Sequence, residues 1–260
     1  MVTEILRPAT VQEALKAKGL PGAMFLGGGT WLNARRHPEP VTLVSLERLG
    51  LSSIQADGRR CVLGATATFQ QIMDHPGVPS SLKSAAGLTA SRTLRNMMTI
   101  GGEVALHAAD SALIPLLMAM EAEVGLAGKK KPVPFRDFLS GGAGALVLSV
   151  NIPEPGRPSA VLAVSRTSHG PRSLVVAASA SAFRPAVKGL RIVVSDCRGT
   201  PVRLSKLEFS LEDQALPPRS AIEQIPLREI SFAADIHASL AYKAYLARVL
   251  VADALHGARP

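Results

Sequence analysis

The chain has 260 residues, of which 47% are hydrophobic, and it carries a formal net charge of +9. A chain of this length and composition can bury one large core or two modest ones, so it is a globular protein. The basic residues are scattered apart from residues 129–131, and only 4% of residues are aromatic. This pattern argues against nucleic-acid binding.

The amino-terminal part alternates helical and extended segments. The spacing of Thr10 and Glu13 is that of a capping box and predicts a helix over residues 11–18. The apolar run 23–26 predicts a short buried strand that leads directly into three glycines. Further elements are expected as a strand over 42–46, a strand over 61–64, a helix from 68 to 73, and a helical then extended stretch over 80–98.

The second half of the chain predicts a helix followed by a sheet. A helix rich in Leu and Met is expected over about 111–121, with Pro115 in its first turn. Short β-branched runs then predict strands over 145–152, 160–166, 174–183 and 190–195. The apolar spacing of residues 238–255 predicts a closing helix. Residues 153–158 contain three prolines and a glycine, which makes them the best candidate for a domain junction.

Membrane and metal signals are missing from the sequence. Pro115 and two glutamates interrupt the longest apolar stretch, so it cannot supply the roughly 18 to 20 residues of a membrane span. The first residues include an acid and no apolar block, unlike a secretory signal, and we expect a cytoplasmic protein. The two cysteines, Cys61 and Cys197, lack the spacing of a zinc or iron–sulfur site. We therefore expect no metal ligands in this chain.

The three glycines after the predicted strand, Gly27, Gly28 and Gly29, have two explanations. Successive glycines expose backbone N–H groups in one concavity and let a diphosphate approach closely. A tight turn after a strand also needs glycine for backbone reasons alone. The G-x-G-x-x-G spacing and the following acidic residue of a Rossmann site are absent. Taken alone, the glycines favour the structural explanation.

A second motif changes this interpretation. Residues 94–103 read Leu-Arg-Asn-Met-Met-Thr-Ile-Gly-Gly-Glu, and Asp110 follows. Together with Gly-Gly-Gly-Thr-Trp-Leu at 27–32, this motif resembles the signatures of the FAD-binding subunits of molybdenum hydroxylases. That family includes the medium subunits of carbon monoxide dehydrogenase and the flavin domains of xanthine dehydrogenase. Shorter matches in the family's order extend the resemblance over essentially the whole chain, at residues 7–14, 63–66, 134–138, 201–204 and 235–243.

The resemblance implies an α+β fold with two domains. A bipartite FAD-binding domain of the vanillyl-alcohol oxidase (PCMH) type would occupy residues 1–155, with lobes of about 1–55 and 56–155. A small α+β carboxy-terminal domain would occupy residues 156–260. FAD would lie between the two lobes, with its diphosphate over the first glycine motif and its flavin near the second.

The same resemblance implies the residues that contact the cofactor, and it implies no catalytic side chain because FAD itself carries the redox chemistry. For Asp110 the alternative role is that of a helix N-cap. The implied FAD-binding residues are Leu26, Gly27, Gly28, Gly29, Thr30, Trp31, Leu32, Thr99, Gly101, Gly102, Asp110, Val147 and Arg166.

The sequence departs from the family's pattern at several positions. Glu103 stands where the family has asparagine, and it precedes Asp110 by only seven positions. Thr89 falls near the position where animal members place an aromatic ring against the flavin. Arg166 stands near a lysine and arginine pair of the family. His169 is either a proton partner near the flavin or a surface residue.

The leading functional hypothesis is an electron-transfer flavoprotein subunit. It would accept electrons from a partner's iron–sulfur cluster and pass them from FAD to NAD⁺, oxygen or another redox protein. Its partners would be an iron–sulfur subunit and a molybdenum-cofactor subunit. The finer likeness is to FAD subunits of purine hydroxylase or selenate reductase systems. The alternatives are a self-sufficient flavin oxidase of the same fold and a scaffold subunit that has lost FAD.

Overall fold

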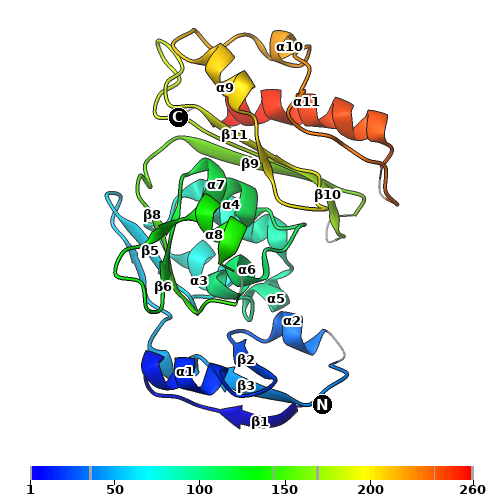
Figure 1. The fold of residues 1–260 in the computed structure, drawn as a ribbon. Helices are drawn as coiled ribbons and strands as arrows, with labels where there is room; N and C mark the ends of the chain where they lie inside the picture. Colours follow the sequence, from blue (N-terminus) through cyan, green and yellow to red (C-terminus); the bar gives the residue numbers. More distant parts are fainter. Residues whose placement is uncertain (1, 35–36, 143, 168–169, 237, 259–260) are drawn as a thin grey trace.

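The computed structural model describes residues 2–258 except 35–36, 143, 168–169 and 237. Three layers are stacked along the molecule in Figure 1: an amino-terminal lobe, a central lobe and a carboxy-terminal domain. Each layer combines helices with a sheet of its own. The predicted α+β class is therefore confirmed.

The amino-terminal lobe is a small parallel sheet with one flanking helix. Its strands are β1 (Val2–Leu6), β2 (Ala23–Leu26) and β3 (Val41–Ser45), in the order β1-β3-β2. Helix α1 (Val11–Lys18) begins at the predicted N-cap, where the Thr10 side chain accepts a hydrogen bond from the Glu13 N–H at 3.2 Å. The Glu13 carboxylate accepts from the Ala9 N–H at 2.9 Å, so the reciprocal bond of a capping box to the Thr10 N–H is replaced by one to its neighbour. Ala14 of α1 is buried against the sheet. The lobe is completed by the one-turn helix α2 (Thr30–Asn33) and a 3₁₀ turn, η1 (Glu47–Leu49).

The central lobe packs helices on an antiparallel sheet of order β4-β5-β8-β6-β7. Its strands are β4 (Ile54–Ala56), β5 (Cys61–Gly64), β6 (Glu123–Leu126), β7 (Val133–Pro134) and β8 (Val147–Ile152). Its helices are α3 (Phe69–Asp74), α4 (Ser80–Thr89), α5 (Arg92–Arg95), α6 (Ile100–Leu106), α7 (Leu113–Ala119) and α8 (Phe135–Gly141). Fully buried Leu63, Phe69 and Leu116 belong to its core.

The carboxy-terminal domain is an antiparallel sheet of order β12-β11-β10-β9, with helix α11 on its outer face. The strands are β9 (Ser159–Ser165), β10 (Arg172–Ser179), β11 (Arg191–Ser195) and β12 (Val202–Arg203). The helices are α9 (Ser205–Leu211), α10 (Arg219–Ile222) and α11 (Leu240–Gly257).

The central strand of this sheet is buried on both faces. Side chains alternate along a strand, so Val175 and Ala177 of β10 join the core of the central lobe, whereas Leu174 and Val176 join the core beneath α11. Helix α7 covers the inner face, where it contacts β10 and β11. The core is therefore continuous across the Pro-rich segment 153–158.

Most predicted elements are present within a residue or two of their expected ends. The main difference is at the second glycine pair, because successive glycines favour a turn and no helix was expected there. Gly101 and Gly102 instead lie in the first turn of helix α6, because the Thr99 side chain caps that turn by accepting from the Gly102 N–H at 3.2 Å. The other elements that were not predicted are β1, β4, β6, β7, β12, α2, α5, α8, α9, α10 and η1; the end of the stretch 80–98, expected to be extended, instead contains α5.

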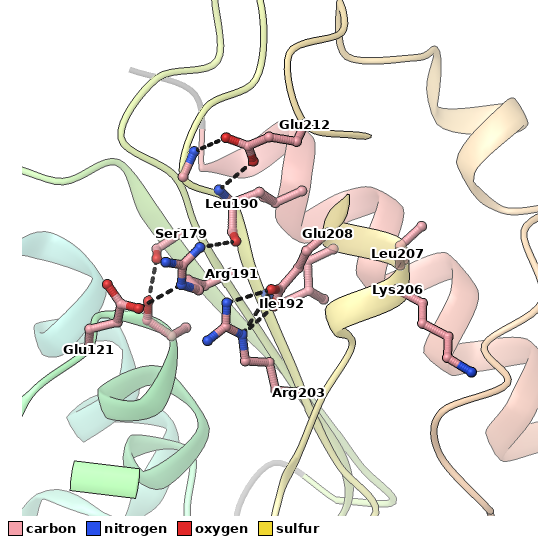
Figure 2. A network of polar contacts seen from close by, with 12 residues as sticks. Glu121, Ser179, Leu190, Arg191, Ile192, Arg203, Lys206, Leu207, Glu208 and Glu212 are labelled. Carbon is pink, nitrogen blue, oxygen red and sulfur yellow. Dashed lines mark hydrogen bonds and ion pairs between the residues drawn. The ribbon is translucent and has the colours of Figure 1, made fainter. Parts of the chain in front are cut away.

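Ion pairs and backbone contacts fix the outer part of the carboxy-terminal sheet (Figure 2). The buried Glu208 carboxylate on α9 accepts hydrogen bonds from the Ile192 N–H at 2.8 Å and from Arg203 Nε at 2.8 Å. Glu121, which follows α7, pairs with Arg191 at 2.7 Å. These contacts attach α9 to the sheet and the sheet to the central lobe.

Replacing Glu208 tests this attachment. Glu208→Ala leaves the Ile192 N–H and the Arg203 guanidinium without their acceptor, so we expect the free energy of unfolding to fall by about 2–3 kcal/mol. The measurement is urea unfolding followed by circular dichroism. Glu39→Ala removes an exposed carboxylate and should have little effect. Equal unfolding curves for the two variants would contradict the assigned role.

Candidate functional site

A cavity of about 600 Å³ lies between the amino-terminal and central lobes. Its size is within the range of small-molecule and cofactor sites, and its lining is largely apolar with a few polar groups. The glycine loop after β2 forms one side, and helix α6 with the segment before it forms the other. The lining residues that were predicted from the sequence are Gly27, Gly28, Gly29, Thr30, Trp31, Leu32, Thr99, Gly101, Gly102, Asp110 and Val147.

The glycine loop is packed directly against the second motif. A Cβ atom on Gly28 would lie 1.6 Å from the Met97 carbonyl oxygen, and one on Gly27 would lie 2.9 Å from Thr99 Oγ1. Gly29 has φ +71°, a left-handed conformation that favours glycine, and it begins helix α2. All three positions therefore need glycine because of backbone geometry or neighbouring protein atoms.

Backbone hydrogen bonds attach the second motif to the chain segment that follows β5. The Gly101 N–H donates to the Ala65 carbonyl at 2.8 Å, and the Ile100 N–H donates to the Ala67 carbonyl at 3.0 Å. A Cβ on Gly101 would lie 2.6 Å from the Ala65 Cβ. Gly101 thus allows α6 to start in close contact with the chain that leaves β5.

Two of the predicted contact residues are not part of the cavity lining. Leu26, the last residue of β2, packs with the small core cluster of Leu32, Val41 and Leu43. Arg166 lies after β9, where its Nη1 atom donates to the Ile236 carbonyl at 3.3 Å. His169, the possible proton partner, is outside the described residues.

Arg172 is a cavity residue that the sequence did not indicate. It is the first residue of β10, and its Nη1 atom donates to the Asp110 carbonyl at 3.1 Å. Burial lowers the pKa of Arg172, while the negative charge of Asp110 opposes this change. The carboxy-terminal domain therefore contributes a cation to the cavity, although no motif marks this residue.

Glu103 is a buried acid in the same cavity. Its side chain is on α6 and is only 4% exposed. Burial raises the pKa of Glu103 to about 7; the hydrogen bond from Ser111 lowers it, the negative charge of Asp110 raises it, and Arg172 lowers it. The residue that departs from the family's pattern thus lies inside the site.

Ser111 connects Glu103 to the following helix. The Ser111 hydroxyl oxygen accepts hydrogen bonds from the Leu113 N–H at 3.1 Å and the Ile114 N–H at 3.3 Å, at the start of α7. The N-cap residue of α7 is Ala112, and the Ser111 side chain accepts from the first N–H groups of the helix from one position earlier, so Asp110 does not have the capping role considered for it. The Asp110 side chain is exposed at the edge of the cavity.

Two further features of the described part of the structure concern membranes and metal ions. Its helices include none with the length and apolar character needed to cross a membrane. Within the same residues, no three or more His, Cys, Asp or Glu side chains form a group that could hold a metal ion.

Comparisons with known proteins agree with the geometry of the cavity. The family described as "FAD binding domain in molybdopterin dehydrogenase" matches residues 1–155. The chain is 32% identical over 257 residues to the uncharacterized protein YgfM of Escherichia coli K12, covering 97% of this chain and 95% of that protein. It is 28% identical over 279 residues to subunit alpha of the 6-hydroxypseudooxynicotine dehydrogenase complex of Paenarthrobacter nicotinovorans, covering 96% and 94%.

A solved structure shows the same fold over the whole chain. Carbon monoxide dehydrogenase from Hydrogenophaga pseudoflava contains a chain that matches with a TM-score of 0.86 at 24% identity, covering 99% of this chain and 97% of that one. The resemblance inferred from the two motifs is thereby confirmed. This chain belongs to the family of FAD-binding domains of molybdopterin dehydrogenases, and it is an oxidoreductase subunit that binds FAD.

Proposed function

We propose that this chain is the electron-transfer flavoprotein of a molybdenum hydroxylase complex. It receives electrons from the iron–sulfur cluster of one partner subunit, downstream of a molybdenum-cofactor subunit, and passes them from FAD to NAD⁺, oxygen or a redox protein. The observation that carries the proposal is the cavity in which both glycine motifs meet. The cysteine content supports it as well, because a cluster normally requires four cysteines and this chain has two.

The cavity residues fit FAD by their chemistry. Residues 27–29 line the cavity with backbone alone, which a diphosphate can approach closely; Thr30 offers a hydroxyl donor to it, and Asp110 offers a carboxylate acceptor to the hydroxyl groups of the ribityl chain. Trp31 and Val147 supply apolar surface for the rings. Bound FAD supplies both one-electron and two-electron transfer, and the protein contributes binding, orientation and local electrostatics.

Neither alternative function fits as well. An autonomous flavin oxidase needs a base beside the flavin, and Glu103 is the observation in its favour, since a base is most effective with a pKa near the working pH. A scaffold without FAD would have no use for a cavity of about 600 Å³ between the lobes. The family assignment also argues against the scaffold.

The deciding experiment compares the complex with the isolated chain. The complex, purified with its partners, should contain iron and molybdenum, and anaerobic addition of a purine should bleach the visible band of the flavin. The isolated FAD-loaded chain should stay oxidised. Bleaching of the isolated chain by the same purine would identify an autonomous oxidase instead, and a complex without iron or molybdenum would contradict the proposed partners.

Gly28 is the sharpest position for testing the cavity. Gly28→Ala introduces a Cβ that overlaps the Met97 carbonyl, so the loop must shift and FAD content should fall at least about tenfold. The matched control is Gly141→Ala, because a Cβ there has nothing within 4 Å. The measurement is the flavin absorbance per protein after purification, together with circular dichroism to check the fold. Equal flavin content in the two variants would show that the cofactor lies elsewhere.

Thr30 and Asp110 test the polar contacts. Loss of one hydrogen bond is worth about 0.5–1.5 kcal/mol, and more when a charge is involved. Thr30→Ala and Asp110→Ala should each raise the Kd for FAD several-fold to tens of fold, measured by quenching of flavin fluorescence. Unchanged affinity in both variants would mean that the cofactor has been misplaced.

A further inference from the structure

Among the residues that the structure describes, two cations and two acids line the cavity, and they differ in their access to solvent. The charged side chains among its lining residues are Lys18, Glu103, Asp110 and Arg172. Asp110 is exposed, so water screens its charge, whereas Glu103 is buried. Glu103 is therefore the acid whose ionisation is most sensitive to any charge brought into the cavity.

We propose that Glu103 takes up a proton when FAD binds, so that the cofactor lies beside a neutral carboxylic acid. This inference rests on the proposed FAD site. FAD brings a doubly anionic diphosphate into the cavity, and an ionised, desolvated carboxylate would repel it. Protonation removes that repulsion and converts the carboxyl group into a hydrogen-bond donor.

The groups around Glu103 leave it free to respond in this way. From β10, Arg172 favours the ionised form; from the segment before α7, Ser111 also favours it, while Asp110 opposes it. Burial lowers the pKa of His107 at the end of α6, so this imidazole adds no positive charge at neutral pH.

The two strands packed against α6 bring no charged side chain to Glu103. Strands β5 and β8 pack against α6, and the titratable group among their residues is the Cys61 thiol. Burial raises the pKa of Cys61 to about 11, and burial is also the main cause that raises the pKa of Cys197 to about 12. Both thiols therefore stay neutral between about pH 5.5 and about pH 8.5. The positive charge of Lys243 on α11 lowers the pKa of Cys197, against the larger effect of burial.

The direction of the pH dependence follows from these charges. The protein's own groups raise the pKa of Glu103 to about 7, and the diphosphate raises it further. Above about pH 7, Glu103 is ionised in the free protein and protonated in the FAD complex, so FAD binding takes up a proton. The affinity for FAD therefore falls by up to tenfold for each unit by which the pH rises. Below about pH 6 both forms are protonated and affinity no longer depends on this group.

The test is isothermal titration of the full chain, freed of flavin, with FAD. Titrations in buffers of different ionisation enthalpy count the protons taken up, from about pH 5.5 to about pH 8.5. We expect wild type to take up close to one proton at the alkaline end and almost none at the acid end. Glu103→Gln should bind FAD with no proton uptake and should bind it more tightly than wild type at about pH 8.5. Glu4→Gln, an exposed carboxylate on β1, should behave as wild type.

The possible outcomes separate this inference from the proposed function. If wild type binds FAD without proton uptake, or if Glu103→Gln keeps the pH dependence, Glu103 is not the coupled group although FAD binding stands. If wild type binds no FAD at any pH, the proposed function itself is wrong. Should Glu103→Gln fail to fold, the proton count of wild type still decides the matter.

Discussion

The contact between the glycine loop and residues 97–101 is the constraint on which the whole site depends. Gly28 lies so close to the Met97 carbonyl that no side chain fits, and within the central lobe Gly101 in turn lies against Ala65. Two lobes with separate sheets are thereby brought backbone to backbone, and the cavity is the space that remains beside this contact. The glycines therefore position protein against protein first. Their benefit to a bound diphosphate follows from that arrangement.

A residue of the carboxy-terminal domain also lines the cavity. Arg172 comes from the first residue of β10 and donates to the Asp110 carbonyl across the boundary with the central lobe. It is also one of the charges that act on Glu103. The carboxy-terminal domain thus helps to set the electrostatics around the cofactor, in addition to covering the apolar face of α7.

Local patterns predicted much of the fold and of the site. The capping residues of α1, the run that forms β2 and the two glycine motifs were all readable because neighbouring residues determine them. The helix that starts at Ile100 was missed, since glycines favour a turn locally and contacts with Ala65 and Ala67 override this preference. Arg172 could not be found, because it meets Asp110 only through the pairing of distant strands. Arg166 was inferred from family position alone, and its side chain is directed to Ile236.

The strand β10 also constrains how this protein could have been assembled from smaller genes. Residues 153–158 look like a linker, and a recombination event there would separate the chain into two pieces of reasonable size. Such a cut would expose apolar surface on both pieces, because Val175 and Ala177 belong to the core of the central lobe, whereas the core of Leu174 and Val176 beneath α11 would stay intact in the second piece. A break at this junction would therefore separate surfaces that pack together, although the segment resembles a hinge.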